Sequence, residues 1–261
     1  MSQKNFQCDY SGNQKNKAEL NNYKLTIQYD GTVYSGWQMQ SGQNTIQQKM
    51  SDSIAILLNE KVNLIGSGRT DSGVHALGQI ANFKTEQFIG NDKFLYSLNS
   101  ILPQDISVLK IEQINEGFHS RYDAKKRIYI YLITKHKSPF LTNYAYFYHY
   151  QTDCTLLNRL SASVTGKKDF TSFSRKNSDT QNKICEVYEA CWKETRDLVI
   201  FYISADRFLH GMVRTIVGTL LYAVKKNLDD KYLENIFSGK DRTLAAEAAP
   251  AKGLFLFKVK Y

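Results

Sequence analysis

The sequence has few cysteines, and none are spaced as in a metal or redox motif. Its 261 residues include four cysteines without a CxxC pair and five histidines without an HxxxH or HxH pair. Zinc sites usually draw ligands from such closely spaced pairs, and a disulfide framework needs an oxidising compartment. We therefore predict that the thiols are reduced and that the chain binds no metal. The cysteines are Cys8, Cys154, Cys185 and Cys191.

Long hydrophobic runs are also missing. Lys, Arg, Asp or Asn interrupts every apolar stretch before it reaches the roughly 18 residues that a membrane-spanning helix needs. Residues 1–22 are polar and lack the apolar core of a secretory signal, so we predict that they form a disordered extension. The sequence therefore predicts a cytoplasmic protein without a membrane anchor.

The charge is basic and unevenly distributed. There are 34 Lys and Arg against 25 Asp and Glu, a net charge of +9, and residues 131–261 contribute 20 of the basic and 13 of the acidic residues. Basic clusters at 125–127, 167–168 and 175–176, with 14 Phe and 17 Tyr that can stack on bases, are typical of a protein that binds nucleic acid. Any one cluster is more typical of a solvated surface, so only the total points to a polyanion.

Hydrophobic periodicity predicts an α+β fold. Residues 23–29 alternate between apolar and polar side chains, as in a half-buried strand. Thr45 followed by Gln48 resembles a capping box ahead of a helix over 46–58, and a second helix is expected over 93–100. The other strands expected in this half lie at 62–65, 79–85, 106–114 and 127–134.

The second half of the chain repeats this pattern. Asp153 is predicted to cap a helix, and a longer helix is expected over 208–226. With residues 135–150 as the connection, we predict an N-terminal α+β domain over 23–135 and a C-terminal α+β domain over 136–261. The other elements expected in this half are strands at 184–194, 197–205 and 254–261 and a short helix at 230–238.

The most unusual segment is the glycine-punctuated loop 66–76, GSGRTDSGVHA. Three glycines within eight residues permit a tight backbone that a ligand can approach, and they flank Arg69 and Asp71. The segment lacks the Gly-Lys-Ser/Thr ending of a Walker loop, and it is not a GxGxxG motif at a helix start. From the residues alone it is a phosphate loop, a catalytic loop or a turn in which Asp or Thr satisfies backbone amides.

The loop and the segments around it resemble one family. Residues 68–76 match the signature GRTD, a small residue and GVHA of the TruA family of tRNA pseudouridine synthases, and the resemblance covers 23–261. The departures are the extension 1–22, Ser72 where Ala is common, and 245–249 where Gly and Thr are often found. The other matching segments, in order, are Tyr29 to Thr32, Gly36 to Gln38, Leu98 to Asn99, Leu102 to Pro103, Phe118 to Arg121, Arg127 to Tyr131, Asp169 to Phe170, Phe208 to Leu209, Met212 to Arg214 and Pro250 to Leu254.

The resemblance implies an activity, a fold and a set of partners. The activity is isomerisation of uridine to pseudouridine in the anticodon stem-loop of tRNA, at positions 38, 39 and 40. The fold is two ferredoxin-like (split βαβ) halves whose mixed or antiparallel sheets meet across a basic cleft, and the assembly is a homodimer. The resemblance implies no cofactor and no metal, in line with the cysteine and histidine spacing.

The reaction explains why a carboxylate is needed. Breaking the bond between ribose and N1, turning the uracil and rejoining it through C5 requires a group that bonds reversibly or stabilises a cationic sugar, and a carboxylate does either. Its place in the motif makes Asp71 that group. The sequence leaves open whether Asp71 attacks C1′ of the ribose, attacks C6 of the base, or takes the proton from C2′ to give a glycal.

The resemblance also implies two residues that handle the target base. A uridine stacked in an RNA stem must be flipped out, at a cost on the order of a few kcal/mol, and the gap filled. Arg69 resembles the residue that fills the gap, although an Arg in such a loop is also typical of a phosphate contact. Tyr129 resembles the tyrosine that stacks on the flipped uracil and assists removal of the C5 proton, whereas the strand pattern alone indicates a core residue.

Arg214 lies among apolar residues of the predicted helix 208–226, where an unpaired charge is unfavourable. His210, Arg214 and Gly218 are spaced by four, so Arg214 can point away from the apolar face. Its position matches the basic residue that pairs with the catalytic aspartate in this superfamily, so the resemblance implies an ion pair with Asp71. The alternative is an Arg whose head group extends into water.

Two other functions stay open on the sequence. A related synthase acting on other tRNA sites or on another RNA would share these motifs, and a catalytically silent tRNA-binding or tRNA-folding protein would use the same cleft. The intact 68–71 motif and Arg214 favour the enzyme, because binding alone does not require the carboxylate. The basic charge and the missing nucleotide motifs disfavour a small-molecule enzyme.

Overall fold

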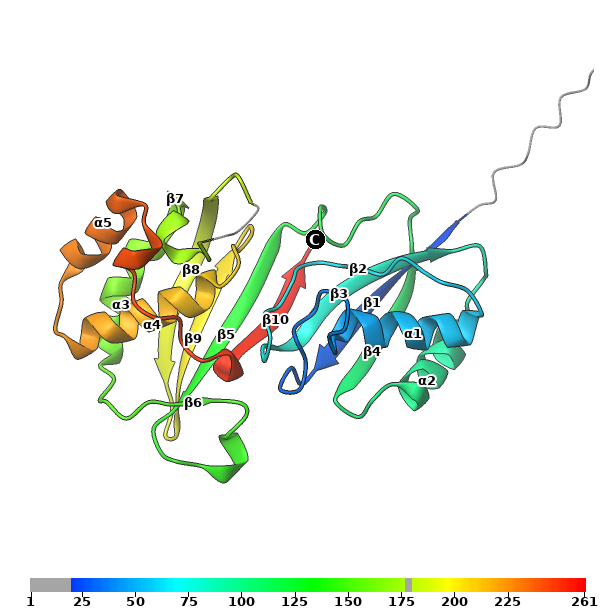
Figure 1. Cartoon of the computed structure of the whole chain (residues 1–261), viewed down its shortest axis with the longest axis horizontal. Coiled ribbons are helices and arrows are strands. Elements are labelled where there is room, and N and C mark those ends of the chain that lie inside the picture. The colour runs from blue at the N-terminus through cyan, green and yellow to red at the C-terminus, as the bar shows by residue number, and fades with distance from the viewer. Residues whose placement is uncertain (1–19, 177–179) are drawn as a thin grey trace, which may run out of the picture.

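The computed structural model describes residues 20–176 and 180–261. Within these ranges ten strands form one mixed sheet accompanied by five α-helices, so the predicted α+β class is confirmed (Figure 1). The strands are β1 (Asn21–Tyr29), β2 (Ile65–Gly66), β3 (His75–Thr85), β4 (Ile106–Ile114), β5 (Lys126–Thr134), β6 (Tyr146–Phe147), β7 (Gly166–Asp169), β8 (Ile184–Glu194), β9 (Leu198–Ala205) and β10 (Leu254–Lys260). The helices are α1 (Ile46–Leu58), α2 (Asn91–Ile101), α3 (Cys154–Ser161), α4 (Met212–Lys225) and α5 (Asp230–Gly239). None of these helices has both the length and the apolar character that crossing a bilayer requires.

The C-terminal strand joins the two halves of the chain. The main strand order is β4-β1-β3-β10-β5-β9-β8-β7, so β10 lies between β3 of the first half and β5. It runs parallel to β3, with Phe255 opposite His75, and antiparallel to β5. The connection 135–150 returns to the sheet through β6, which pairs with β5. The sheet is therefore continuous through the middle of the molecule (Figure 1).

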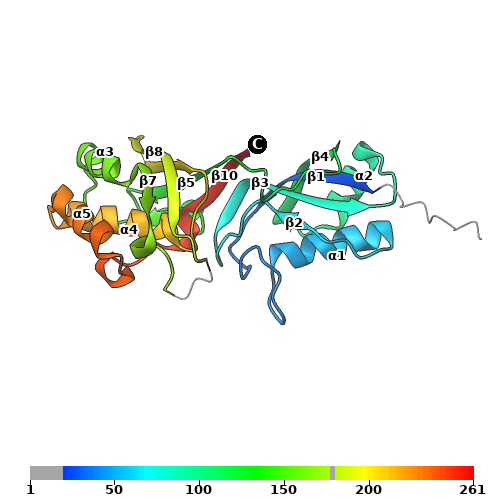
Figure 2. The ribbon, with the colours of Figure 1, turned by 90° about the horizontal axis from the view of Figure 1, so that it is seen from above.

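The long helices α1 and α4 lie on the same side of this sheet. They are on the near side in Figure 1 and below the strands in Figure 2. On β5, Tyr129 and Tyr131 are buried, whereas Ile130 and Leu132, which alternate with them, are only partly covered. Because successive strand residues point to opposite faces, the far side of the central strands carries partly exposed apolar side chains.

Most predicted elements are confirmed to within a few residues, and the differences at the helix starts have physical causes. Thr45 caps α1 as expected, accepting a hydrogen bond from Gln48 N at 3.4 Å. The Gln48 side chain donates to Asp52 Oδ1 instead of turning back to Thr45, so the reciprocal half of the capping box does not form. The long helix begins at Met212 rather than near 208, because Gly211 before it is left-handed, with φ +74°.

The boundaries of three strands also differ from the predictions. The predicted extension 1–22 lies outside the described residues as far as residue 19, and its last two residues already belong to β1. β3 begins at His75, four residues before the predicted start, and β2 covers 65–66 rather than 62–65. The glycine-rich loop is therefore shorter than predicted, and both of its ends are anchored in the sheet.

Helix α4 is closely packed against the segment that leads into β10. Ala249 N donates to Arg214 O at 2.9 Å. A Cβ added to Gly218 would lie 1.9 Å from Glu247 O, far inside any real contact distance. The glycine therefore allows this segment to lie directly on the helix.

We predict that Gly218→Ala destabilises the protein, although alanine is the better helix former by about 1 kcal/mol. Overpacking of this kind costs about 1–3 kcal/mol and should lower the melting temperature by several degrees. Thermal unfolding measures the effect. Gly90→Ala is the control, because a Cβ there meets no atom within 4 Å. A melting temperature of Gly218→Ala at or above that of the parent would contradict this prediction.

Candidate active site

The loop that carries Asp71 runs between β2 and β3 and is held at both ends. Ser67 Oγ donates to Gln79 Oε1 at 2.6 Å, and Gln79 Nε2 donates to Gly68 O at 2.9 Å. After the carboxylate, Val74 N donates to Asp71 O at 3.2 Å and closes a turn. These bonds fix the backbone on both sides of Asp71.

A second segment, residues 29–37, lies directly against this loop. Trp37 N donates to Thr70 O at 3.1 Å, and the hydroxyls of Tyr29 and Thr70 are hydrogen-bonded at 2.8 Å. Gly36 has φ +91°, and a Cβ there would lie 2.5 Å from Thr70 O. Only glycine permits this conformation and this approach. Residues 29–37 therefore support the loop that carries Asp71 directly.

Asp71 is paired with two basic side chains from the second half of the chain. Arg214 Nη1 lies 3.3 Å from Asp71 Oδ2, and His210 Nε2 lies 3.2 Å from Asp71 Oδ1. The Asp71 and Arg214 side chains are 21% and 23% exposed, so the pair is largely shielded from solvent. A nearby cation favours the charged form of a carboxylate, whereas burial opposes it. The two groups predicted to pair do lie together.

Arg214 is fixed by a second contact on its other side. Its Nε donates to Ala249 O at 2.7 Å, on the segment that packs against α4. The head group therefore does not extend into water, which was the alternative for this residue. The acceptor is a backbone carbonyl, so this contact does not depend on which side chains occupy positions 245–249.

Tyr129 lies on β5, close enough to Asp71 for the two groups to interact electrostatically. Its side chain is 7% exposed, and its ring meets that of Phe208 edge-on, with centroids 5.1 Å apart and an interplanar angle of 85°. Burial first, and then the charge of Asp71, raise the pKa of Tyr129 well above its usual value. The phenol is therefore neutral and presents an aromatic surface next to the carboxylate.

Arg69 does not pair with Asp71. Its side chain is exposed, and its Nε donates to Gln38 Oε1 at 2.9 Å. Gln38 directly follows the segment that supports the loop, so the guanidinium is held beside that segment. An exposed cation held by one neutral amide can exchange that contact for a ligand at little cost.

The site contains His210, which the sequence reasoning did not include. Its side chain is 46% exposed and lies in the turn before α4. The spacing of four between His210 and Arg214 is the signal that could have found it. That spacing alone was insufficient, because α4 begins after His210 and the contact with Asp71 depends on the left-handed turn at Gly211.

The chemistry of this cluster suits a reactive carboxylate rather than a bound cation. The described parts of the chain contain no group of three or more His, Cys, Asp or Glu side chains that could hold a metal ion. Around Asp71 the partners are an arginine and a histidine, with an aromatic ring beside them. The arrangement provides an anion that can act as nucleophile or base, and a surface on which a planar base can stack.

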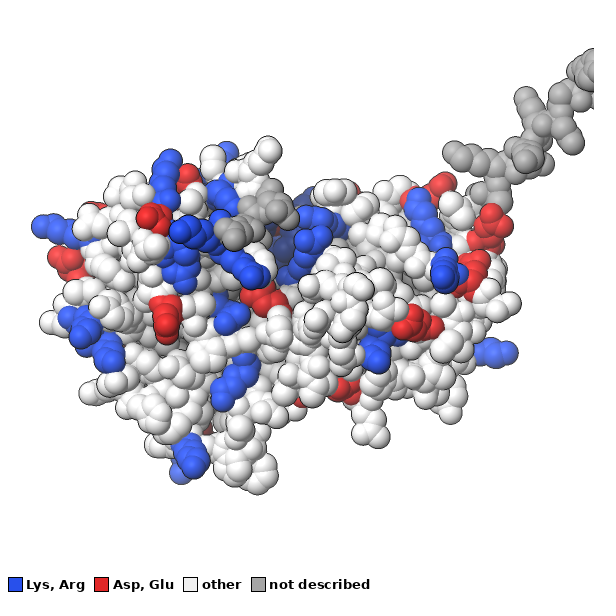
Figure 3. Space-filling model, in the orientation of Figure 1, with Lys and Arg blue, Asp and Glu red and all other residues white. Residues whose placement is uncertain are grey.

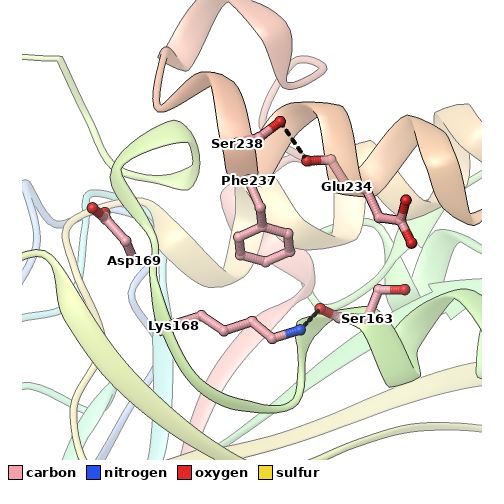
Figure 4. A pocket seen from close by; sticks show the side chains of 6 residues that line it. All are labelled: Ser163, Lys168, Asp169, Glu234, Phe237 and Ser238. Atoms are coloured by element: carbon pink, nitrogen blue, oxygen red, sulfur yellow. Dashed lines mark hydrogen bonds between the residues drawn. The ribbon is translucent and has the colours of Figure 1, made fainter.

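The surface of the protein carries many basic side chains. On the face shown in Figure 3, Lys and Arg outnumber Asp and Glu, and several lie in and beside the recess between the two halves. A separate hollow lies in the second half, between β7 and α5 (Figure 4). It is lined by Lys168, Asp169 and Phe237 among others, and it shares no residue with the surroundings of Asp71. The candidate site is therefore assigned by its chemistry and not by the depth of a pocket.

Comparison with known proteins gives a consistent result. A family described as tRNA pseudouridine synthase matches residues 25–123 and 161–261. The tRNA pseudouridine synthase A of Clostridium acetobutylicum is 42% identical over 244 residues, which cover 93% of this chain and all of the relative. The protein of the same name from Caldicellulosiruptor bescii is 43% identical, and the match covers 93% of this chain and all of the relative. That from Bacillus subtilis is 38% identical, and the match covers 91% of this chain and 98% of the relative.

The matched ranges contain both sides of the ion pair. The first range includes the loop with Asp71, and the second includes α4 with Arg214. Similarity over this much of the chain, together with the paired carboxylate, leads to one conclusion: the chain belongs to the tRNA pseudouridine synthase family.

Proposed function

We propose that this chain is an enzyme that isomerises uridine to pseudouridine in the anticodon stem-loop of tRNA, at positions 38, 39 and 40. The observation that carries the proposal is the contact between Asp71 and Arg214, two side chains 143 positions apart in the sequence. Such a pair in a recess bordered by basic residues suits chemistry on an RNA. The names of the relatives support tRNA as the substrate.

In this proposal Asp71 is the catalytic nucleophile, and Arg214 balances its negative charge. Breaking the bond between N1 of the uracil and C1′ leaves a sugar that is electron-poor at C1′. A carboxylate can bond to this carbon, stabilise its positive charge or take a proton from C2′. Attack at C6 of the base uses the same anion. All of these routes require Asp71 to be charged, so they share the dependence on Arg214.

Tyr129 and Arg69 are proposed to handle the flipped base. The neutral, largely buried ring of Tyr129 beside Asp71 supports stacking on the uracil and assistance with removal of the C5 proton. The exposed guanidinium of Arg69, held only by Gln38, supports insertion into the gap left in the stem. A phosphate contact by Arg69 is the alternative, and its exposure is compatible with that role as well.

The finer architecture is also part of the proposal. We infer two ferredoxin-like halves, an N-terminal domain over 23–135 and a C-terminal domain over 136–261, that share the continuous sheet and enclose a basic cleft. Supporting this, α1 and α2 accompany strands of the first half, and α3, α4 and α5 accompany strands of the second. The basic side chains in the recess of Figure 3 support the charge of the cleft.

A homodimer completes the proposal. On the far side of the sheet, Ile130 is opposite Tyr202 and Leu132 is opposite Ile200, and all four side chains are partly exposed. An apolar patch of this kind on a charged protein is typical of an interface, and the proposed occupant is a second copy of the chain. We place the activity in the cytoplasm, where a tRNA-modifying enzyme meets its substrate.

The main alternatives are a synthase with other RNA targets and a tRNA-binding protein without catalysis. The first differs only in the RNA position at which pseudouridine is formed. The second gains no advantage from a carboxylate held between an arginine and a histidine, since an anion in an RNA-binding recess repels phosphate. The paired Asp71 therefore favours the enzyme.

We predict that Asp71→Asn abolishes isomerisation and leaves tRNA binding nearly intact. Asn keeps the shape of the side chain but supplies no anionic nucleophile, so the single-turnover rate should fall at least about 1000-fold. Pseudouridine formation and tRNA affinity are measured on the same preparation. The control is Asp197→Asn, which makes the same charge change at an exposed position between β8 and β9. Residual turnover within about tenfold of the parent would remove Asp71 from the mechanism.

The affinity for tRNA should fall steeply with salt. A protein with a net charge of +9 that follows an RNA backbone releases counterions from several phosphates. We expect the dissociation constant to rise at least about tenfold between roughly 50 and 200 mM monovalent salt. Filter binding or fluorescence anisotropy across that range measures the slope, and a constant affinity would rule out the basic cleft.

Arg214→Met should depress catalysis. Methionine keeps the apolar stem but removes the cation that lies 3.3 Å from Asp71 Oδ2 and balances its charge. Arg214→Lys should retain part of the activity as a point charge without the forked geometry. Arg159→Met is the control, because Arg159 is 59% exposed and lies on α3. A parental rate in Arg214→Met would show that the pair has no catalytic role.

A further inference from the structure

Arg127, at the start of β5, uses all five of its guanidinium N–H groups. Nε and one Nη2 hydrogen donate to Ser67 O at 3.2 and 2.8 Å, and the other Nη2 hydrogen donates to Arg121 O at 2.8 Å. Nη1 donates to Asp206 O at 2.7 Å and to Ala124 O at 3.3 Å. All five contacts are therefore made to backbone carbonyls.

These carbonyls belong to segments that are far apart in the sequence. Ser67 is at the root of the loop that carries Asp71. Asp206 follows the end of β9 and begins the turn 206–211, which contains His210 and leads into the helix of Arg214. One side chain thus joins the two parts of the chain that supply the carboxylate and its basic partners.

The guanidinium of Arg127 is hydrogen-bonded only to these carbonyls within the described residues. Burial lowers the pKa of Arg127 from its usual value, and the nearby charge of Asp206 opposes part of this shift. Among residues 20–176 and 180–261, no carboxylate forms an ion pair with it. A partly buried cation without an ion-paired carboxylate depends on its hydrogen-bond acceptors. The guanidinium and the segments it binds are therefore held in one arrangement.

We propose that Arg127 is a positioning residue for the reaction: its guanidinium holds the root of the Asp71 loop against the turn 206–211, and so sets the distance between Asp71 and its two basic partners. The proposal rests on the proposed function, in which Asp71 is the reacting group. Arg127 itself touches neither Asp71 nor, in this account, the substrate.

Lysine cannot replace this arrangement. An ammonium group is a single point with three donors on a flexible stem, and it cannot reach carbonyls of four residues at once. If the loop and the turn separate by about 1 Å, the reacting geometry is lost, at a cost of about 100-fold in rate. The affinity for tRNA, which depends on many phosphate contacts, should change little.

The experiment compares the parent, Arg127→Lys, Arg127→Ala and the core variant Ile54→Val, which is destabilised at a buried position of α1. Hydrogen exchange of 66–74 and 206–211 measures positioning, and single-turnover pseudouridine formation on saturating tRNA, with the dissociation constant, measures its consequence. For Arg127→Ala, the rate is also measured with about 20 mM guanidinium chloride against the same concentration of NaCl, because the free cation can occupy the vacated site and bind the same carbonyls.

For Arg127→Lys we expect exchange in both segments to be at least about tenfold faster than in the parent, with exchange in β1 unchanged. The single-turnover rate should fall by about 30–100-fold, while the dissociation constant changes by less than about threefold. Guanidinium, and not NaCl, should restore part of the rate of Arg127→Ala. If Arg127→Ala does not fold, the lysine variant decides the outcome.

Three results would overturn the proposal. The first is a parental rate and parental exchange in Arg127→Lys. The second is a loss of rate matched by an equal loss of tRNA affinity. The third is a loss of rate in Ile54→Val as large as that in Arg127→Lys when the two variants have the same melting temperature. Arg127 would then contribute only to the general stability of the protein. If the parent itself forms no pseudouridine, the proposed function fails, and the exchange measurement still decides whether Arg127 holds the two segments together.

Discussion

The contact between Asp71 and Arg214 is the interaction on which the rest of the site depends. The two side chains come from opposite halves of the chain, and each is only about one-fifth exposed. A carboxylate in such a place loses part of its hydration, and a neighbouring cation compensates for that loss. Much of the surrounding structure can be understood as the means of keeping these two groups a few ångströms apart.

Each member of the pair has its own backbone support. The Asp71 loop is fixed by the Gln79 side chain on β3 and by the close approach of Gly36 to Thr70 O. Arg214 is fixed by Ala249 O, on a segment that lies on α4 because residue 218 has no side chain. β10, which follows the segment that holds Arg214, lies in the same sheet as β3, which follows the Asp71 loop. The site therefore depends on elements from both halves of the chain.

Much of this fold could be predicted from local patterns, and much of the site could not. Alternation and capping indicated the elements, since these depend on neighbours in the sequence. The position of β10 beside β3 depends on pairing between Phe255 and His75, 180 residues apart, for which no local pattern exists. The residues alone left the roles of Asp71 and Arg214 open, and only the family resemblance predicted that the two side chains form a pair. The contacts of His210 and Arg127 involve a left-handed turn and backbone carbonyls, which a sequence pattern does not display.

The most direct test of the account is to map pseudouridine in unmodified tRNA after incubation with the purified protein. The account predicts new pseudouridine in the anticodon arm, at positions 38, 39 and 40 where these are uridine, and none elsewhere in the same molecules. Pseudouridine confined to another arm would assign the paired carboxylate to a different target. The absence of any product under conditions where tRNA is bound would contradict the claim that Asp71 is a catalytic group.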